Sequence, residues 1–185
     1  MKISECIHLI NDDFKRYAEY INRGKKKTSV FKIAVSSILG IGPSQTVLFY
    51  RLSRWFLLSR VPFVHFIFCR LNLILNGADI SAYADIGPGF FVAHSQGIVI
   101  GQNVKCGQNL TIFQNVTIGA KSPFDGKEEM PNLGNNVTLY AGCKVLGPIS
   151  IGDNVKIGAN VVITSNVTNN NTIVVDRTVN LIIPI

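Results

Sequence analysis

The sequence is poor in the residues that usually stabilise small secreted or metal-binding domains. Its 185 residues include four cysteines and three histidines, and the cysteines lie far apart, without a C-x-x-C pair. This spacing argues against a zinc site and against a disulfide framework, so we expect no bound metal and buried free thiols. Charged residues make up only 16% of the chain and apolar residues 47%, which excludes a disordered chain. The cysteines are Cys6, Cys69, Cys106 and Cys143.

Long apolar runs are also missing. No window of about 18 apolar residues occurs without a breaker, so we predict no transmembrane helix. The first fourteen residues contain four charged side chains and no apolar block. We therefore expect no signal peptide and a cytoplasmic location.

The charge is divided unevenly between two regions. Residues 1–75 carry twelve Lys or Arg and four Asp or Glu, whereas residues 76–185 carry six and seven. The first region begins with an apolar stripe at helical spacing, for which Ser4 is a candidate N-cap and Gly24 a candidate stop. We predict an α-helical N-terminal region over 1–75 and a second domain over 76–185. The stripe consists of Ile7, Ile10, Phe14, Tyr17 and Ile21.

Residues 30–75 are dense in Leu, Phe and Ile, with arginines between them, and two interpretations stay open. The helices pack on each other or on a partner subunit, or a basic apolar surface makes peripheral contact with an anionic bilayer. His65 lies in an apolar helical run and is predicted to be a core or interface histidine. The basic residues follow no nucleic-acid-binding motif, so no nucleic acid is predicted as a partner.

From Asp79 onward the sequence repeats every six residues. The first position of each repeat is aliphatic, with one cysteine, while the second favours Gly and the fourth is often Asn. A short strand followed by a tight turn gives this period, because Gly and Asn accept the positive φ of the turn. Three such sides make one coil, and coils stack through parallel backbone hydrogen bonds. The first positions are Ile80, Ile86, Val92, Ile100, Cys106, Ile112, Ile118, Leu133, Leu139, Val145, Ile151, Ile157 and Ile163.

The predicted fold is therefore mainly β, a parallel β-helix preceded by a small α-helical region. The inward positions place Cys106 and Cys143 in the core. Residues 121–132 have no repeat character and contain Pro, Gly and three acids. This segment must leave the coil as an excursion loop, and long excursions from a rigid scaffold often carry function.

His94 occupies the third position of its repeat, beside a turn, and should project outward. Asp79 precedes it by fifteen residues and falls one coil away. A carboxylate that accepts a hydrogen bond from one imidazole nitrogen fixes the tautomer and leaves the other nitrogen free to take a proton. The pair is thus a candidate general base for a hydroxyl group. A surface histidine beside a turn is the alternative.

The run "GADISAYADIGPGFFVAHSQGIVIGQN", with "QNVTIGA" and "AGCKVLG", resembles the serine O-acetyltransferase family of hexapeptide acyltransferases. The resemblance covers about residues 76–168. It implies a left-handed β-helix, a homotrimer and acetyl-CoA as the donor. It also implies His94 as general base, Asp79 as its orienting group, and direct attack of the acceptor hydroxyl on the thioester.

The same resemblance implies further site residues. Backbone N–H groups at Gly119 and Ala120 would stabilise the oxyanion. The CoA arm would lie between coils of adjacent subunits, although Lys156 is equally explained as a solvated lysine. The positions that match the family's CoA groove are Ala141, Gly142, Lys156 and Ala159.

Some positions depart from the pattern of enzymes that acetylate free serine. Ala93 replaces an aspartate before the histidine, and Glu129 and Met130 replace an Arg-His pair. Without the arginine, a bound carboxylate lacks a charge-assisted partner. Sugar acetyltransferases of capsule and colanic-acid pathways share these departures, so the main prediction is O-acetylation of a saccharide, polymeric or lipid-linked. Hydrogen bonds to the sugar would come from Asp125, Glu128 and Glu129, or these acids form only a solvated loop.

Two alternatives remain. The first is a serine O-acetyltransferase of cysteine synthesis. The second is a β-helix scaffold without catalysis, suggested by Val175–Thr178, which replace the family's C-terminal G-V-P-A element.

Overall fold

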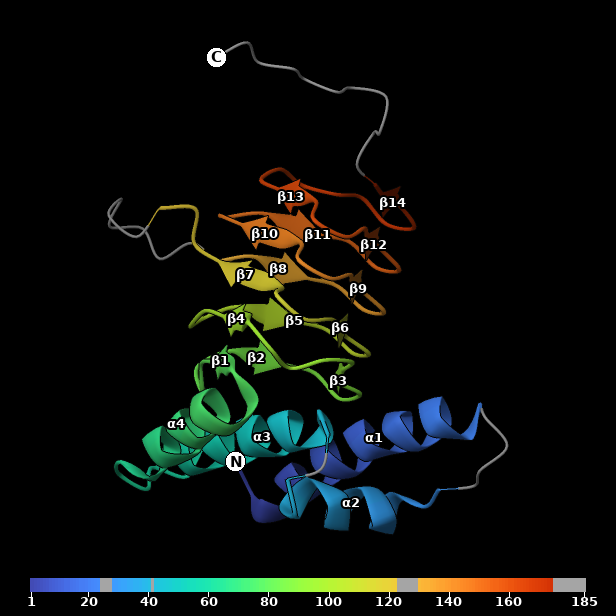
Figure 1. The fold of residues 1–185 in the computed structure, drawn as a ribbon. Helices are drawn as coiled ribbons and strands as arrows, with labels where there is room; N and C mark the ends of the chain where they lie inside the picture. The colour runs from blue at the N-terminus through green and yellow to red at the C-terminus, as the bar shows by residue number, and fades with distance from the viewer. Residues whose placement is uncertain (24–27, 41, 123–129, 175–185) are drawn as a thin grey trace, which may run out of the picture.

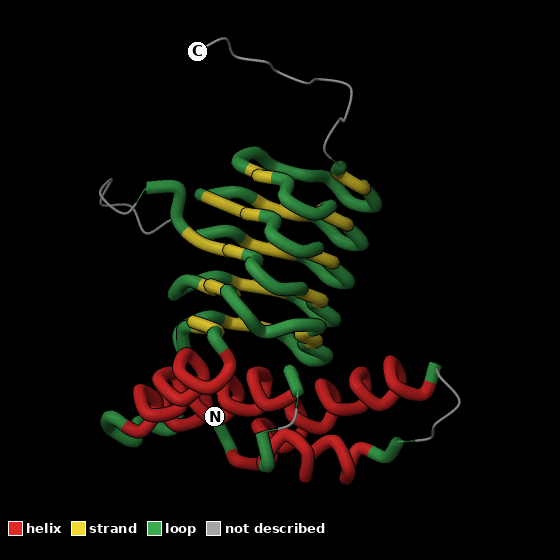
Figure 2. The backbone as a smooth tube through the Cα atoms, viewed as in Figure 1, coloured by secondary structure: helices red, strands yellow, loops and turns green. Residues whose placement is uncertain are grey.

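Four helices precede the first strand in the computed structural model, which describes residues 1–23, 28–40, 42–122 and 130–174. They are α1 (Ile3–Asn22), α2 (Val30–Ile38), α3 (Ser44–Leu58) and α4 (Val64–Asn76), and they lie across one end of a stack of strands (Figures 1 and 2). The predicted first helix is confirmed, but Ser4 does not cap it. The N-cap is Lys2, two residues before Ser4, and the Glu5 carboxylate accepts a hydrogen bond of 2.9 Å from the Lys2 N–H.

The rest of the described chain forms short parallel strands arranged in three sheets. Sheet A has the order β1-β4-β7-β10-β13, sheet B the order β2-β5-β8-β11, and sheet C the order β3-β6-β9-β12-β14. Neighbours within each sheet are successive coils of one winding chain, so the predicted parallel β-helix is confirmed. The strands are β1 (Ala78–Ile80), β2 (Asp85–Ile86), β3 (Phe91–Val92), β4 (Ile98–Ile100), β5 (Lys105–Cys106), β6 (Thr111–Ile112), β7 (Thr117–Gly119), β8 (Asn132–Leu133), β9 (Thr138–Leu139), β10 (Lys144–Leu146), β11 (Ser150–Ile151), β12 (Lys156–Ile157), β13 (Val162–Ile163) and β14 (Thr172–Ile173).

The three sheets enclose a prism, and the side chain at the first position of every repeat points into it. Each of these side chains is buried, and so are the core thiols of Cys106 and Cys143. Burial raises the pKa of both thiols to about 12. The inward positions predicted from the six-residue period are therefore confirmed along the whole described length of the coil.

The turns between strands use asparagine as predicted. Seven asparagines of the described β-helix have φ between 56° and 61°, a left-handed conformation that Asn tolerates better than most residues. At one edge their side chains also form a ladder: Asn109, Asn136 and Asn154 each donate to the asparagine of the next coil at 2.9–3.0 Å. The ladder satisfies amides that would otherwise compete with backbone hydrogen bonding.

The coils differ in length, as the offset between Val92 and Ile100 and the break after Ile118 in the repeat predict. Ala78 pairs with Ile98 and Val99 pairs with Thr117, so the first coil is longer than the second by two residues. The two extra residues lie between β3 and β4. Before this corner Phe91 still pairs with Thr111, at the longer spacing, whereas after it Val99 pairs with Thr117, at the shorter one. Thr117 in turn pairs with Lys144, and the excursion between β7 and β8 makes that coil the longest of the three.

Candidate active site

His94 lies on the widened corner of the first coil. Segment 93–97 joins β3 of sheet C to β4 of sheet A, and it contains the two extra residues. Backbone hydrogen bonds fix this corner between its neighbours. Gly97 N–H donates to the Gly77 carbonyl at 2.8 Å, and Asn115 N–H donates to the Gln96 carbonyl at 2.8 Å. His94 is exposed, as an outward side chain should be, so its ring is accessible to a substrate.

Asp79 lies close in the fold to the strand that follows His94. It is the middle residue of β1 and pairs with Val99 of β4, and its side chain is exposed. No hydrogen bond joins Asp79 to His94 in the described chain. Both residues lie on the outer surface of the first coil, which runs from Ala78 to Gly97, so the expected separation by one coil is wrong. Their cooperation as a catalytic pair stays a prediction.

The corners stacked above His94 follow one edge of the prism, which we name the C–A edge. It consists of the segments that lead from sheet C to sheet A, namely 93–97, 113–116, 140–143 and 158–161. Aromatic rings mark its outer side. The His94 ring centroid lies 6.5 Å from that of Phe113, and Phe113 stacks on Tyr140 at 5.3 Å. The imidazole is therefore the lowest member of a column of rings.

Three of the four predicted CoA positions also lie on the C–A edge. Ala141 and Gly142 form the corner after β9, and Ala159 lies in the corner above it. Asn160 N–H donates to the Ala141 carbonyl at 2.9 Å, which stacks these corners directly. The structure therefore brings these positions into line with His94, although their role in binding CoA stays a prediction.

Lys156 lies on the outer face of sheet C beside this edge. It lines a groove of about 410 Å³ whose base is formed by residues of α1. The groove combines three cations with several rings, a composition suited to phosphates and an adenine base. Its lining residues are Arg16, Glu19, Tyr20, Arg23, Phe91, Thr111, Phe113, Thr138, Tyr140 and Lys156.

Gly119 and Ala120 lie at the opposite edge of sheet A. Gly119 ends β7, and a Cβ placed on it would meet no atom within 4 Å, so a ligand can approach its backbone. Because Ile100 pairs with Ile118, Gly119 is level with Gly101, four residues beyond Gly97. At about 3.3 Å per residue the two ends are roughly 13 Å apart. One chain therefore does not bring His94 and the predicted oxyanion amides together.

The excursion starts beside Gly119, between β7 and β8. The predicted substrate residues Asp125, Glu128 and Glu129 lie outside the described residues. Met130 is described and half-buried, and its side chain packs against the hydrophobic core. The thioether of Met130 carries no charge that could pair with a charged group of the acetyl acceptor.

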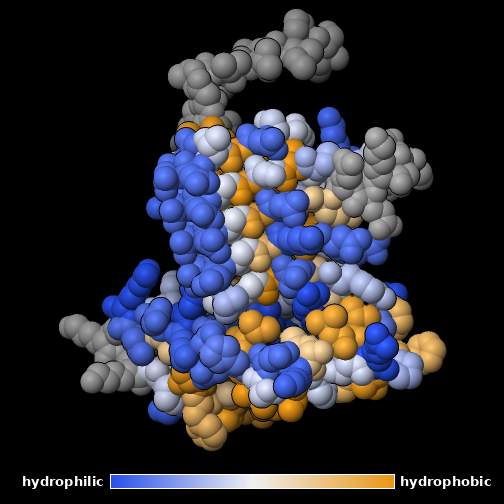
Figure 3. Space-filling model, turned by 180° about the vertical axis from the view of Figure 1, so that it is seen from behind, coloured by the Kyte–Doolittle hydropathy of each residue, from blue (hydrophilic) through white to orange (hydrophobic). Residues whose placement is uncertain are grey.

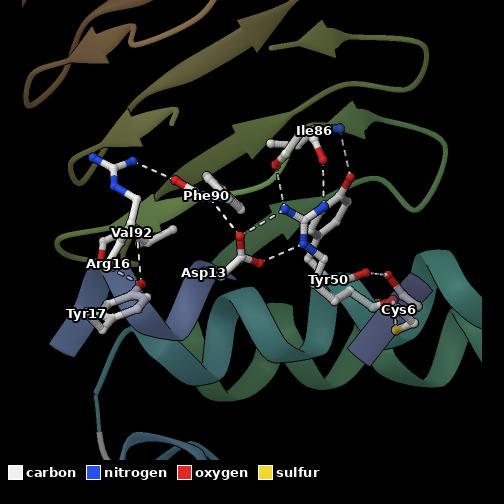
Figure 4. Close-up of polar contacts among 12 residues, drawn as sticks. Cys6, Asp13, Arg16, Tyr17, Tyr50, Ile86, Phe90 and Val92 are labelled. Carbon is white, nitrogen blue, oxygen red and sulfur yellow. Dashed lines mark hydrogen bonds and ion pairs between the residues drawn. The ribbon is translucent and has the colours of Figure 1, made fainter. Parts of the chain in front are cut away.

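Sequence reasoning missed the polar groups that hold the first coil on the helices (Figure 4). Arg51 is buried and binds the Asp13 carboxylate through Nε at 2.7 Å and Nη2 at 3.1 Å. It also donates to the carbonyl groups of Ile86 and Gly87 at 2.6 and 2.7 Å, and Phe90 N–H donates to Asp13 at 2.7 Å. Burial raises the pKa of Asp13, while Arg51 and the Phe90 N–H oppose that shift.

Tyr17 supports the corner of His94 more directly. Its hydroxyl donates to the Val92 carbonyl at 2.9 Å and accepts from the Val92 N–H at 3.0 Å. Val92 lies two residues before His94. Tyr17 is buried, and burial raises its pKa. The sequence contained one signal for these contacts, namely polar side chains on the apolar stripe of the first helix.

No group of His, Cys, Asp and Glu side chains suited to hold a metal ion occurs in the part of the chain that the structure describes. Within the same residues, no helix is both long and apolar enough to cross a membrane.

Residues 130–165 match the family model described as bacterial transferase hexapeptide (six repeats). A serine acetyltransferase of Helicobacter pylori is 41% identical over 110 residues, which is 60% of this chain and 64% of that protein. A serine acetyltransferase of Synechococcus elongatus is 38% identical over 112 residues, or 60% of this chain and 46% of that protein.

The chain is similar to serine acetyltransferases. Serine acetyltransferase isoform 3 of Entamoeba histolytica, solved in complex with cysteine, superposes with a TM-score of 0.79 at 27% identity. The superposition covers 98% of this chain and 62% of that one, so the helical region and the β-helix are both matched. The chain spans about half to two thirds of the length of these serine acetyltransferases.

The similarity to serine acetyltransferases corrects the predicted saccharide acceptor. That prediction relied on Ala93, Glu129 and Met130, and it is wrong because the relatives compared at 38–41% identity are named for serine. The expected likeness to capsule and colanic-acid enzymes finds no support in these comparisons. The physical reason is that these three positions affect only how tightly the ammonium and carboxylate groups of an amino acid bind. Charged groups elsewhere in the site can pair with the same two groups.

Proposed function

We propose that this chain is an O-acetyltransferase that moves the acetyl group of acetyl-CoA to the hydroxyl of L-serine. The similarity to serine acetyltransferases carries this proposal. The exposed imidazole of His94 supports it, because the ring stands on a widened corner beside a column of aromatic side chains. The groove beside Lys156 supports it further, since cations and rings gather within reach of the same edge.

In this proposal His94 accepts the proton of the serine hydroxyl as the oxygen attacks the thioester carbonyl carbon. Asp79 would hold the imidazole in the required tautomer once substrate or a neighbouring subunit orders the site. Backbone N–H groups at Gly119 and Ala120 would stabilise the tetrahedral oxyanion. The carbon–sulfur bond then breaks, the proton passes from the imidazole to the departing CoA thiolate, and O-acetylserine is released.

The proposal includes a homotrimer, because one chain keeps its parts of the site apart. His94 belongs to the C–A edge and Gly119 to the other side of sheet A, roughly 13 Å away by strand rise. A closed ring of identical subunits places one edge of each copy against a different edge of the next. The base of one subunit would then face the oxyanion amides of its neighbour. Light scattering should accordingly give three times the mass of one chain.

The direct test is release of CoA thiol from acetyl-CoA with L-serine, compared between wild type and His94→Ala. We expect His94→Ala to lower kcat by about 10²- to 10⁴-fold, the usual contribution of a general base. His8→Ala is the matched control, since His8 is a second exposed histidine, on α1. An inactive wild type would exclude serine as acceptor, whereas an active His94→Ala variant would exclude only the base.

The acceptor subsite can be tested by adding charge. Enzymes of the resembling family that acetylate free serine carry an aspartate where this chain has Ala93, which is half-buried beside His94. Because an ammonium group here lacks that partner, we expect weak serine binding. Ala93→Asp should lower KM for serine by about tenfold, since a charge-assisted hydrogen bond contributes about 1.5–3 kcal/mol. An unchanged KM would place the ammonium elsewhere.

A further inference from the structure

Helix α4 is oriented with its apolar stripe toward solvent. Phe63, just before the helix, is 75% exposed and Ile74 is 74% exposed. The buried side carries amides instead: Asn72 donates to the Thr46 carbonyl at 3.1 Å, and Asn76 donates to Asn72 at 3.1 Å. The exposed stripe follows helical spacing, so it is one continuous face. We name it the α4 face: Phe63, Phe66, Ile67, Arg70, Leu73 and Ile74.

The loop before α4 extends the same apolar surface. Val61 is exposed in it, as is Leu58 at the end of α3, and two residues of the loop, Arg60 and Phe63, have φ of 57° and 65°. A bulky aromatic residue rarely adopts this left-handed conformation, because its Cβ crowds the backbone. The surrounding structure therefore holds Phe63 outward against its conformational preference, as at sites where a side chain is presented to a partner.

The charge of this region points to an anionic partner. Between Glu19 and Asp79 the sequence has nine Lys or Arg and no Asp or Glu. Arg51 and Arg54 are bound internally by Asp13 and Asp85. Arg60 and Arg70 are exposed, and neither forms an ion pair with any described residue. Both cations therefore lie within or beside the α4 face. Asp79 lines the same pocket as Arg70 without forming an ion pair with it.

We infer that the α4 face and its preceding loop dock on an anionic lipid bilayer. Aromatic and aliphatic side chains would enter the headgroup boundary, while Arg60 and Arg70 bind lipid phosphates. A two-fold contact between the α4 faces of two copies is disfavoured, because it would place Arg60 and Arg70 of one copy against those of the other. Hydrophobic side chains gather over the helical end of the molecule, and others lie between the polar columns of the coils (Figure 3). This contact is peripheral and does not depend on the proposed acetyl transfer.

The test is co-sedimentation of the full chain with vesicles of phosphatidylcholine alone or mixed with phosphatidylglycerol. We expect binding to the mixed vesicles only. Phe63→Asn combined with Phe66→Gln and Ile67→Gln should weaken binding at least about tenfold, since it removes most of the apolar contact. These replacements suit the local backbone, because Asn accepts positive φ and Gln favours helix.

A second variant tests the charges separately. Arg60→Asn with Arg70→Gln should weaken binding about 25-fold, or about fivefold for each cation near the surface. Val174→Ser is the matched control, because Val174 is 68% exposed on the last described coil. Ile74→Gln alone provides a milder change on the same face if the triple variant folds poorly.

Three results would overturn the inference. The first is that the wild-type protein does not sediment with either kind of vesicle. The second is equal binding to neutral and anionic vesicles, which would remove the role of the arginines. The third is a triple variant that changes the mass found by light scattering while vesicle binding stays unchanged, which would make the α4 face an interface between copies.

Discussion

Mixing two inactive variants should restore activity if each active site combines residues of two subunits. His94→Ala removes the proposed base, and Gly119→Val blocks the approach to the proposed oxyanion amides. Gly119 has open space beside its α-carbon and its φ lies outside the positive range, so valine fits the fold. Each variant alone should lose at least about 100-fold in kcat, as expected when a base or an oxyanion donor is lost.

The expected recovery follows from the arrangement of the parts. Within one chain the two residues lie beyond opposite ends of sheet A, and these ends are roughly 13 Å apart, too far for both residues to act on the same carbonyl group. In a mixed ring, a site is intact when the chain that supplies the histidine is the Gly119→Val variant and its neighbour is the His94→Ala variant. With equal amounts and random assembly, about one site in four meets this condition.

The assay is CoA release by trimers purified from cells that produce both variants with different affinity tags. Sequential purification on both tags selects mixed assemblies, and the separately purified variants are mixed just before assay as the control. Every mixed trimer has one intact site among its three, so recovery to about a third of wild-type kcat would support a shared site. Activity no higher than that of the single variants would refute the reasoning, since it would require both residues to act within one chain.

Three further outcomes are expected from the buried polar groups. Arg51→Met should lower the free energy of unfolding in urea by about 3–5 kcal/mol, and combining it with Asp13→Leu should cost less than the sum of the single changes. Tyr17→Phe should lower stability by about 1–3 kcal/mol, because two backbone groups beside the site lose their partner, and kcat should fall more than KM changes. Burial raises the pKa of Cys106 and Cys143 from 9.0 to about 12, so the unfolded chain ionises first and stability should fall as pH rises from about 9 to 12. Urea titrations at pH 8 and 10.5 check this, and the free energy of unfolding of a Cys106→Val variant should fall less between the two pH values. In the folded protein the thiols of Cys106 and Cys143 should resist labelling.

The β-helix could be predicted from sequence because its core is one-dimensional. A residue such as Ile112 contacts mainly the coils above and below it, so a period of six is enough to place it inside. The asparagine turns were predictable for the same reason, since their positive φ is a local requirement. The thiols of Cys106 and Cys143 followed from register alone.

The helical region was less predictable, because its packing is specified by contacts far apart in sequence. Nothing local to Arg51 indicates that it binds Asp13 and the carbonyl groups that precede β3. Helix α4 reverses the usual pattern, with apolar side chains outside and amides inside, so hydropathy predicts its existence but not its orientation. The acceptor was also out of reach, because Ala93 and Met130 indicate only which charges are missing.

Departures from the regular coil indicate where chemistry can occur in this fold. In an ideal coil the backbone amides and carbonyl groups bind the neighbouring coils, and the inward side chains fill the core, so little remains to act on a substrate. The described part of the chain adds length at two places, the corner of His94 and the excursion after Gly119. Both additions adjoin sheet A, one at each end of its strands. An extra residue has no partner position in the next coil, so its side chain can turn outward to contact a ligand. Because the two additions lie at opposite ends of the same sheet, the proposed ring of copies would bring them together.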